Sequence, residues 1–412
     1  MKKSNKHTSV PTLILAVNED CFFLSHRLDI ALAAQEAGWR VVITCADTGL
    51  AGRIRSYGFI FESLPITPRS LNPLKEWRVV SALTRLMRKY PGAIMHFVGM
   101  KLILSGNLAS RLVSSPRGIV NAVSGLGVLF INPNGRLQQS LFRLLRLFKN
   151  SNIPSRTIFQ NADDQRLFSN AGLLEGSEAV YIKGSGVNLN EYYPRDFNDT
   201  DKPQIKNTDK LSLLRSRLSF KNNARPAADK KKLTVLFAGR LLRSKGVEDF
   251  IQAAELLRAK WNGLAEFHIC GALSTNIDSI SEEEMNLMTD GSFIRWFGYR
   301  NDMPNVVRSA DIMAYPSYYR EGVPRILLEA SASGLPLVTC DSVGCRDTVE
   351  PQRNGFLVEK QNPHQLAKAI DTLLSDKRLR RRMGQESRKI AERDYDIHSV
   401  VDKHLEIYNS LL

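Results

Sequence analysis

The chain has few cysteines and lacks any apolar run long enough to cross a membrane. Five of its 412 residues are cysteine, and none of them forms a C-x-x-C pair. An odd, scattered set is typical neither of a disulfide framework nor of a zinc site, and it fits a reducing cytoplasm. The apolar run after the basic N-terminus covers only 10–17, well short of the ~20 residues that a spanning helix needs. We therefore predict a buried first strand, not a signal peptide, in a cytoplasmic protein that is not integral to a membrane.

Acidic residues are missing from one long stretch. Between Glu76 and Asp163 there is no acid, whereas twelve lysines and arginines occur there. The formal net charge of +15 is uneven: 1–193 carry +11, 194–232 carry +6 and 233–412 carry −2. Such an uneven charge distribution favours a polyanionic partner. The candidates are nucleic acid, an anionic membrane surface and a phosphorylated substrate. The basic region has no nucleic-acid recognition motif and no aromatic stacking array, so a nucleic-acid-binding protein is the weaker alternative.

Short apolar runs alternate with helical patterns, and no repeat of 20–50 residues occurs. This alternation predicts an α/β architecture with parallel sheets. Strands are expected at 12–17, 40–45, 60–64, 93–97, 118–122, 157–160 and 179–182, and then at 233–238, 266–270, 294–297, 312–315, 337–339 and 356–358. Helices are expected at 25–37, 363–374, 379–393 and 398–412. The polar segment 194–232 indicates a linker or a solvated excursion, with one short helix at 211–218.

Two carboxylates stand out in 316–338. Glu321 precedes Gly322 and Pro324, so it is expected in a tight loop where a ligand can approach the backbone. Pro324 suits a first helical position, which places Glu329 one to two turns inside a buried helix. Two acceptors held in this way suit the diols of a ribose and of a sugar ring. The alternative is a solvated loop glutamate and a helix glutamate in an ion pair.

A basic pair follows the strand expected at 233–238. Arg240 comes directly after that strand, and Lys245 precedes the next helix. Open α/β sheets bind ligands beyond the carboxyl ends of their strands, and a helix N-terminus favours anions. A planar guanidinium and a compact ammonium there can hold a diphosphate without a metal ion, although exposed loop cations are the alternative. The sequence has two Asp-x-Asp stretches, one at 199–201 in the polar segment and one at 394–396, where Asp396 is expected to cap the last helix. Neither directly follows a strand expected in the first half, so no metal site is predicted.

The Glu-x7-Glu segment and the stretches 239–257, 298–317 and 344–359 resemble, in order and spacing, the retaining glycosyltransferases of family 4. The resemblance implies two Rossmann-like domains of the GT-B type facing each other across a cleft. It implies an acceptor-binding domain at 1–185, a hinge and linker at 186–232, a nucleotide-sugar domain at 233–393, and a C-terminal helix at 394–412 that packs on the first domain.

The same resemblance implies roles for the residues. Glu329 would hold the ribose diol and Glu321 the transferred sugar. Arg240 and Lys245 would neutralise the departing phosphate, a form of electrostatic stabilisation that is valuable in the transition state. The donor is a nucleotide sugar, and no further cofactor is expected. The donor-binding set implied in this way also includes Gly239, Gly298, Gly322, Val323 and Pro324.

The first half resembles one subgroup of that family. The loop after the first strand, 18–23, has no glycine pair, and 95–106 and 121–130 complete the likeness. The subgroup extends sugars linked to undecaprenyl diphosphate in bacterial surface-glycan synthesis. We therefore expect a UDP-N-acetylhexosamine donor, retention of configuration and a lipid-linked acceptor at the inner face of the plasma membrane. A soluble acceptor and an inactive sugar-nucleotide binder are the same-fold alternatives.

Acceptor contacts are expected in the first half. The resemblance places His96 just after a strand at the interdomain mouth, where a packed structural histidine is the alternative. Gly125 and Gly127 permit a close backbone approach, or simply a turn. Arg27 and Lys101, near helix starts, can serve acceptor phosphates.

The pattern at 136–149 predicts an amphipathic helix. Its apolar face would contain Leu137, Leu141, Leu144, Leu145 and Phe148, and its other face Arg136, Arg143, Arg146 and Lys149, with Phe142 and Leu147 among them. Apolar residues on a basic face suit a helix that lies among lipid headgroups. A packed helix with a solvated basic side is the alternative.

Overall fold

The computed structural model describes residues 10–67, 72–126, 135–195, 232–274 and 278–412, and the chain divides into two compact units. Unit 1 contains Met1–Ser185 and His398–Leu412, and unit 2 contains Gly186–Ile397. Two expectations, the short helix at 211–218 and the role of Gly127, lie outside the described residues. No helix within the described ranges is long and apolar enough to cross a bilayer.

Unit 1 contains a parallel sheet of seven strands in the order β3-β2-β1-β4-β5-β6-β7. The strands are β1 (Thr12–Glu19), β2 (Arg40–Ala46), β3 (Ile60–Ser63), β4 (Ile94–Val98), β5 (Gly118–Val123), β6 (Ser155–Phe159) and β7 (Ser177–Tyr181). In β1, Leu13 pairs with Val41 on one side and with Ile94 on the other. The strand order reverses between β1 and β4, so the carboxyl ends of these two strands form the topological switch point.

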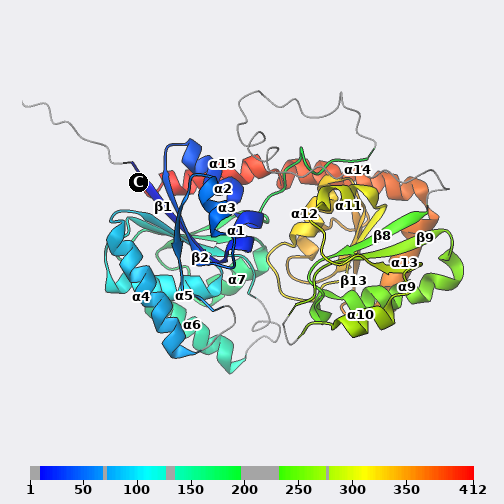
Figure 1. Ribbon diagram of the computed structural model, residues 1–412, viewed down its shortest axis with the longest axis horizontal. Coiled ribbons are helices and arrows are strands. Elements are labelled where there is room, and N and C mark those ends of the chain that lie inside the picture. Colours follow the sequence, from blue (N-terminus) through cyan, green and yellow to red (C-terminus); the bar gives the residue numbers. More distant parts are fainter. Residues whose placement is uncertain (1–9, 68–71, 127–134, 196–231, 275–277) are drawn as a thin grey trace, which may run out of the picture. The chain divides into compact units, whose positions relative to one another are not determined.

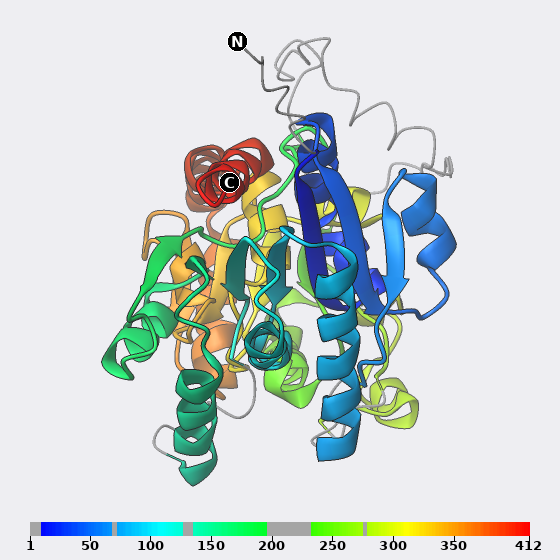
Figure 2. The ribbon, with the colours of Figure 1, turned by 90° about the vertical axis from the view of Figure 1, so that its left-hand side faces the viewer.

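Helices cover both faces of this sheet (Figure 1). They are α1 (Asp20–His26), α2 (Leu28–Glu36), α3 (Ala51–Ser56), α4 (Pro73–Lys89), α5 (Met100–Leu112), α6 (Arg136–Phe148), α7 (Ala162–Asn170) and α15 (Ile397–Asn409). Helices α4, α5 and α6 pack in sequence beside one another (Figures 1 and 2). The prediction of one helix at 25–37 is wrong, because the backbone leaves the helical region at Arg27, with φ −130° and ψ −4°, which separates α1 from α2.

The last helix, α15, packs within unit 1. Tyr408 is fully buried, and its ring meets the edge of Trp39 at 6.0 Å between centroids. At the start of β5, Gly118 leaves no room for a side chain, because a Cβ there would lie 2.9 Å from Leu411. The helix therefore completes the core of this unit.

Unit 2 contains a second parallel sheet, in the order β10-β9-β8-β11-β12-β13. Its strands are β8 (Leu233–Ala238), β9 (Ala265–Cys270), β10 (Ile294–Trp296), β11 (Ile312–Tyr315), β12 (Leu337–Cys340) and β13 (Gly355–Val358). Its helical elements are η3 (Arg243–Lys245), α9 (Val247–Trp261), α10 (Glu282–Met288), α11 (Met303–Ser309), α12 (Arg325–Ala332), η4 (Arg346–Thr348), α13 (Pro363–Ser375) and α14 (Lys377–Asp394). The order reverses between β8 and β11, which makes their carboxyl ends the switch point of this unit.

The expected α/β architecture with two parallel sheets is confirmed. Each of the thirteen predicted strands is present in the described part of the chain, with ends within two residues of those expected. Strands β4, β5, β11 and β12 are buried along their whole length, which explains why they read as continuous apolar runs.

Candidate functional site

The candidate site in unit 2 is formed by the loops that follow β8 and β11. Strand β8 leads through Gly239 and Arg240 into the short turn η3, which ends at Lys245. Strand β11 leads into the loop that carries Glu321 and then into α12, which carries Glu329. Because β8 and β11 are neighbours in the sheet, their loops meet at the switch point.

A buried ion pair joins the two loops. The ammonium of Lys245 contacts the carboxylate of Glu321, and their side chains are only 6% and 16% exposed. The other carboxylate oxygen of Glu321 accepts hydrogen bonds from the hydroxyls of Tyr315, at 3.1 Å, and Ser317, at 3.0 Å. The ammonium also lies over the rings of Tyr315 and Tyr319, at 5.6 and 5.2 Å from their centroids. Burial lowers the pKa of Lys245, and the Glu321 carboxylate opposes that shift.

Glycines let these loops approach each other. Gly246 has φ +79°, and a Cβ there would lie 2.2 Å from the carbonyl oxygen of Pro316. Gly344, in the loop after β12, has φ +84°, and a Cβ there would lie 1.6 Å from the carbonyl oxygen of Gly322. Both positions therefore require glycine, which fixes the loop of Glu321 between its neighbours.

Glu329 has a separate set of partners. Its carboxylate accepts a hydrogen bond from Nε of Arg325, one turn earlier in α12, at 2.8 Å. It also accepts one from the hydroxyl of Tyr192, a residue that is only 5% exposed. Burial, followed by the nearby Glu329 carboxylate, raises the pKa of Tyr192. Helix α12 begins at Arg325 with Pro324 as its N-cap, one residue later than predicted.

The remaining predicted donor residues lie at the same edge of the sheet. Arg240 is exposed, and its guanidinium has no hydrogen-bond or ion-pair partner among the described residues. Gly239 and Gly298 flank Gly271, whose N–H donates to the Gly298 carbonyl at 2.8 Å and where a Cβ would lie 1.9 Å from the Gly239 oxygen. Val323 is buried in the loop after Gly322. The segments that follow β8, β9 and β10 thus contain glycines, whose backbone has no side chain to cover it, close to the guanidinium of Arg240.

His96 lies inside the strand expected at 93–97 and not after it, where the resemblance placed it. The prediction that it follows a strand is wrong, because it lies in the middle of β4 and is fully buried. Its Nδ1 shares a hydrogen bond of 2.7 Å with the Tyr408 hydroxyl, and its ring stacks on that of His404 at 5.8 Å. Burial, and then His404 and Arg27, hold its pKa well below the usual value. This is the packed histidine that the sequence left open as an alternative.

The other predicted acceptor residues in unit 1 are engaged by the protein. Arg27 is 2% exposed and donates to the carbonyl of His26 at 3.1 Å. Lys101 forms an ion pair with Glu76 at 2.7 Å and donates to the Thr67 carbonyl at 2.6 Å. Gly125 has φ +115°, so it does occupy a conformation that favours glycine.

Helix α6 is present as predicted, but its faces differ from those expected. Phe142, assigned to the basic face, packs on the core and meets Phe168 at 6.1 Å between ring centroids, whereas Leu144 is 39% exposed. Arg146 donates to the Ala171 carbonyl at 2.8 Å, and the Lys149 ammonium contacts the Glu175 carbonyl. These two cations tie α6 to the segment after α7. Arg143, which was expected on the same basic face, has no such contact within the described ranges.

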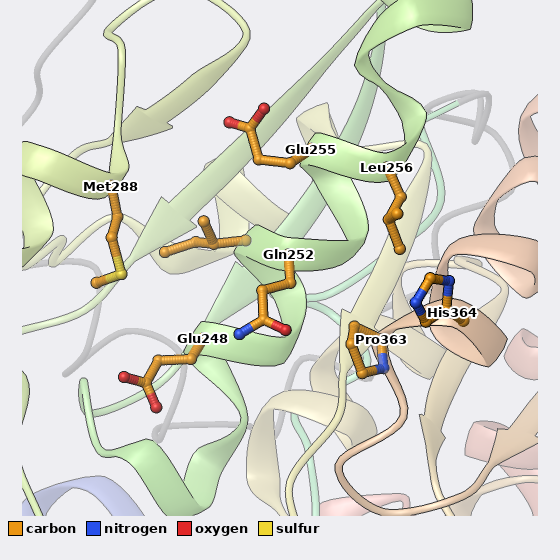
Figure 3. Close-up of a pocket in the computed structure, with 8 residues that line it drawn as sticks. Glu248, Gln252, Glu255, Leu256, Met288, Pro363 and His364 are labelled. Carbon is orange, nitrogen blue, oxygen red and sulfur yellow. The ribbon is translucent and has the colours of Figure 1, made fainter.

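Open grooves and clusters of metal ligands are two other kinds of candidate site. An open groove of about 510 Å³ runs along α9, and Glu248, Gln252, Glu255, Leu256, Met288, Pro363 and His364 border it (Figure 3). None of the predicted site residues lines it. No three histidine, cysteine or acidic side chains in the part of the chain that the structure describes converge as metal ligands.

Several residues of the site were not predicted from the sequence. Tyr315 and Ser317 hold Glu321, Tyr192 holds Glu329, and Gly271 and Gly344 permit the close loops. Gly271, directly after β9, was a usable signal. Tyr192 offered none, because its partner is distant in the chain.

Both halves of the chain are similar to known protein families. Residues 13–155 match the family described as Glycosyl transferase 4-like, and residues 219–390 match Glycosyl transferases group 1. The N,N'-diacetylbacillosaminyl-diphospho-undecaprenol alpha-1,3-N-acetylgalactosaminyltransferase of Campylobacter jejuni is 25% identical over 399 residues, 95% of this chain and 98% of that protein. The UDP-Gal:alpha-D-GlcNAc-diphosphoundecaprenol alpha-1,3-galactosyltransferase of Escherichia coli is 23% identical over 350 residues, covering 84% and 82%.

Solved structures share the fold. The Anabaena protein HepE, in complex with UDP, superposes with a TM-score of 0.70 over 97% of this chain and 100% of that protein, at 19% identity. At that identity the likeness concerns the arrangement of the backbone alone.

Proposed function

Because this chain is a glycosyltransferase of the GT-B type, in which a glycosyl transferase 4-like domain precedes a group 1 domain, we propose that it extends a lipid-linked saccharide. The acceptor in this proposal is a sugar on undecaprenyl diphosphate, and the product belongs to a bacterial surface glycan. The donor is a UDP-sugar, an N-acetylhexosamine by preference, and the anomeric configuration is retained. The names of the Campylobacter and Escherichia relatives support the acceptor, and the UDP held by HepE supports the donor.

The observation that carries the proposal is the junction of Lys245 and Glu321 at the switch point of unit 2. A carboxylate and an ammonium are held together there, and the exposed guanidinium of Arg240 belongs to the same strand end. We assign the two cations to the diphosphate and Glu321 to the hydroxyls of the transferred sugar. When the bond from the sugar to the phosphate breaks, negative charge grows on the departing oxygen, and fixed cations stabilise it without reorganising.

Glu329 is assigned to the ribose diol. Its carboxylate keeps acceptor capacity beyond its hydrogen bonds to Arg325 and Tyr192, since an ionised carboxylate has about four lone-pair sites. The ribose does not react, so Glu329 would contribute to binding equally in the ground and transition states.

This division of labour is testable with two isosteric variants. Glu329→Gln should weaken the binding of plain UDP, measured by calorimetry, by about one to two decades, because a charge-assisted hydrogen bond contributes about 1.5–3 kcal/mol. Glu321→Gln should hardly change UDP affinity but should lower turnover severely. Equal losses of UDP affinity in both variants would contradict the assignment.

The acceptor and the sugar are tested separately. A panel of UDP-sugars incubated with the purified enzyme and a bacterial membrane extract should place one labelled sugar in the lipid fraction. Incorporation into a water-soluble sugar, with none in the lipid fraction, would point to the same-fold alternative with a soluble acceptor. Retention of DNA on the protein without UDP binding would point to the nucleic-acid alternative.

A further inference from the structure

Helix α4 exposes two large apolar side chains side by side. Leu74 is 76% exposed and Trp77 is 57% exposed, and their spacing of three residues places them on one face of the helix. The other tryptophans differ: Trp39 and Trp261 are buried, and Trp296 is half-buried. A solvent-exposed tryptophan next to an exposed leucine is costly in water. It is common where a protein meets the headgroup region of a bilayer, because the indole has an apolar body and a polar N–H.

Cations surround this apolar pair. Lys75 and Arg78 are exposed in the same two turns, and Arg85 and Arg88 continue the outward face toward the C-terminus of α4. The one acidic residue of the helix, Glu76, is paired with Lys101. The outward face of α4 therefore combines exposed apolar side chains with cations that have no ion-pair partner among the described residues. An anionic lipid surface complements this combination better than a neutral one does.

The position of α4 in the fold places this apolar and basic surface near the ligand-binding edge of the unit 1 sheet. The ion pair between Glu76 and Lys101 joins the first turn of α4 to the first turn of α5, which begins directly after β4. Leu74 and Trp77 thus lie at the carboxyl end of the unit 1 sheet, the edge where open α/β sheets bind ligands. Figures 1 and 2 show α4 as the long helix beside α5.

We propose that the first two turns of α4 insert Leu74 and Trp77 into an anionic membrane surface, with Lys75 and Arg78 bound to lipid phosphates. The insertion brings the acceptor-binding edge of unit 1 to the plane in which a lipid-linked phosphate lies. This inference extends the proposed function, but it makes a separate prediction, because UDP binding is assigned to unit 2 and membrane insertion to unit 1.

Helix α6 is less suited to this role. Arg146 and Lys149 are already bonded to backbone carbonyls, and Phe142 packs inward. Its exposed leucines, Leu144 and Leu147, lie in the second half of the helix. Leu74 and Trp77, in contrast, lie in the first two turns of α4. The α6 leucines therefore provide a matched comparison on the same layer of helices.

The test uses the full chain and vesicles of phosphatidylglycerol and phosphatidylcholine in equal parts. Vesicle addition should shift the tryptophan emission to the blue, and lipids brominated in the acyl chain should quench it. Both signals should vanish in Trp77→Phe, which keeps an apolar ring and should still sediment with vesicles. The double variant Leu74→Ser/Trp77→Ser should lower the vesicle partition coefficient about tenfold or more. Vesicles of phosphatidylcholine alone should bind wild type weakly.

Two controls separate this face from others. Leu287→Ser/Tyr299→Ser removes a similarly exposed leucine and aromatic residue from unit 2, and it should leave partitioning unchanged. Leu144→Ser/Leu147→Ser should do the same if α4 carries the insertion. Calorimetric binding of UDP should be retained in every variant, which shows that unit 2 is folded.

Three outcomes would overturn the inference. One is partitioning of the α4 double variant equal to that of wild type. Another is loss of partitioning in the α6 variant alone. The third is a blue shift that follows protein concentration without vesicles, with a change in sedimentation velocity, because this face would then join two copies of the chain. Failure of UDP binding in wild type would instead count against the proposed function.

Discussion

At the scale of single residues, the site contains two cations in very different surroundings. The guanidinium of Arg240 is exposed and has no partner among the described residues, whereas the ammonium of Lys245 is buried and paired with Glu321. Removing a buried ion's partner costs far more than removing a surface charge, because the remaining charge stays desolvated. The two residues therefore differ in what their loss does to the fold, even if both bind the donor.

The variants Arg240→Ala and Lys245→Ala should both weaken UDP-sugar use by about one to two decades, as expected for a lost charge-assisted hydrogen bond of about 1.5–3 kcal/mol. Only Lys245→Ala should also lower the free energy of unfolding, by about 3 kcal/mol, since it leaves Glu321 unpaired. Steady-state kinetics and urea unfolding measure the two effects. Turnover should survive EDTA; full loss, restored by magnesium or manganese, would contradict the metal-free proposal.

Tyr192 is a positioning residue for Glu329 in this structure. Its backbone carbonyl accepts a hydrogen bond of 2.9 Å from Arg388, which also donates to the Ala332 carbonyl at the end of α12 at 2.8 Å. Tyr192→Phe removes only the hydroxyl that holds the Glu329 carboxylate. We expect the KM for the UDP-sugar to rise about three- to tenfold with kcat nearly unchanged, because a hydrogen bond to a charged group is lost from a site that binds the unreactive ribose.

The matched variant is Tyr193→Phe, on the neighbouring residue, whose ring lies against the guanidinium of Arg308. It should leave both kinetic constants unchanged. A fall in kcat without a rise in KM for Tyr192→Phe would show that the hydroxyl serves the reacting sugar instead.

At the scale of elements, the loops after parallel strands are held in place by glycines without space for a side chain. Gly246→Ala meets two costs: the left-handed backbone, about 1–2 kcal/mol, and overlap with the Pro316 carbonyl, typically a further 1–3 kcal/mol. Gly291→Ala is the control, since Gly291 has φ +68° and open space around it. Urea unfolding should show the larger loss for Gly246→Ala, and UDP affinity should fall for this variant alone.

The helices and strands were predictable where their burial produces a recognisable pattern of apolar residues in the local sequence. Strands such as β4 and β11 are buried on both faces, so their apolar runs identified them. The break at Arg27 was not predictable, because no glycine or proline marks it. The local pattern also located Glu321 and Glu329, but their partners Lys245 and Tyr192 come from distant segments that only the sheet order brings together.

The amphipathic pattern at α6 illustrates a second limit. A helical projection assigns faces by angle alone, and it grouped Leu144 with the buried residues and Phe142 with the exposed ones. The helical projection cannot show which other elements pack against the helix. In the structure, Leu141 and Phe142 both pack against the core cluster of unit 1. The apolar pair on α4, Leu74 and Trp77, could be identified only from the solvent exposure of these side chains in the structure.

At the scale of the whole molecule, the C-terminal helix closes unit 1 over a pair of neutral histidines. Burial, and then Arg27, lowers the pKa of His404 to about 3, and burial also holds the pKa of His96 well below its usual value. His404 Nδ1 donates to the Val400 carbonyl at 2.7 Å, and Tyr408 shares a hydrogen bond with His96. Protonating either ring would place a charge in a closed interior beside the guanidinium of Arg27.

The sign of the pH dependence follows from these shifts. In the unfolded chain a histidine has a pKa of about 6.5, so between about pH 6.5 and 3 the unfolded state binds more protons than the folded state. The free energy of unfolding should therefore be at its full value above about pH 6.5 and should fall as the pH falls through that window. Between pH 7 and 5.5 each such histidine contributes a loss of about 1 kcal/mol. His404→Gln, which has no charge to gain, should lose about 1 kcal/mol less than wild type over that interval in urea unfolding, whereas exposed His364→Gln should behave as wild type. An equal loss in wild type and His404→Gln would mean that His404 is protonated in the folded protein, and that α15 tolerates the charge.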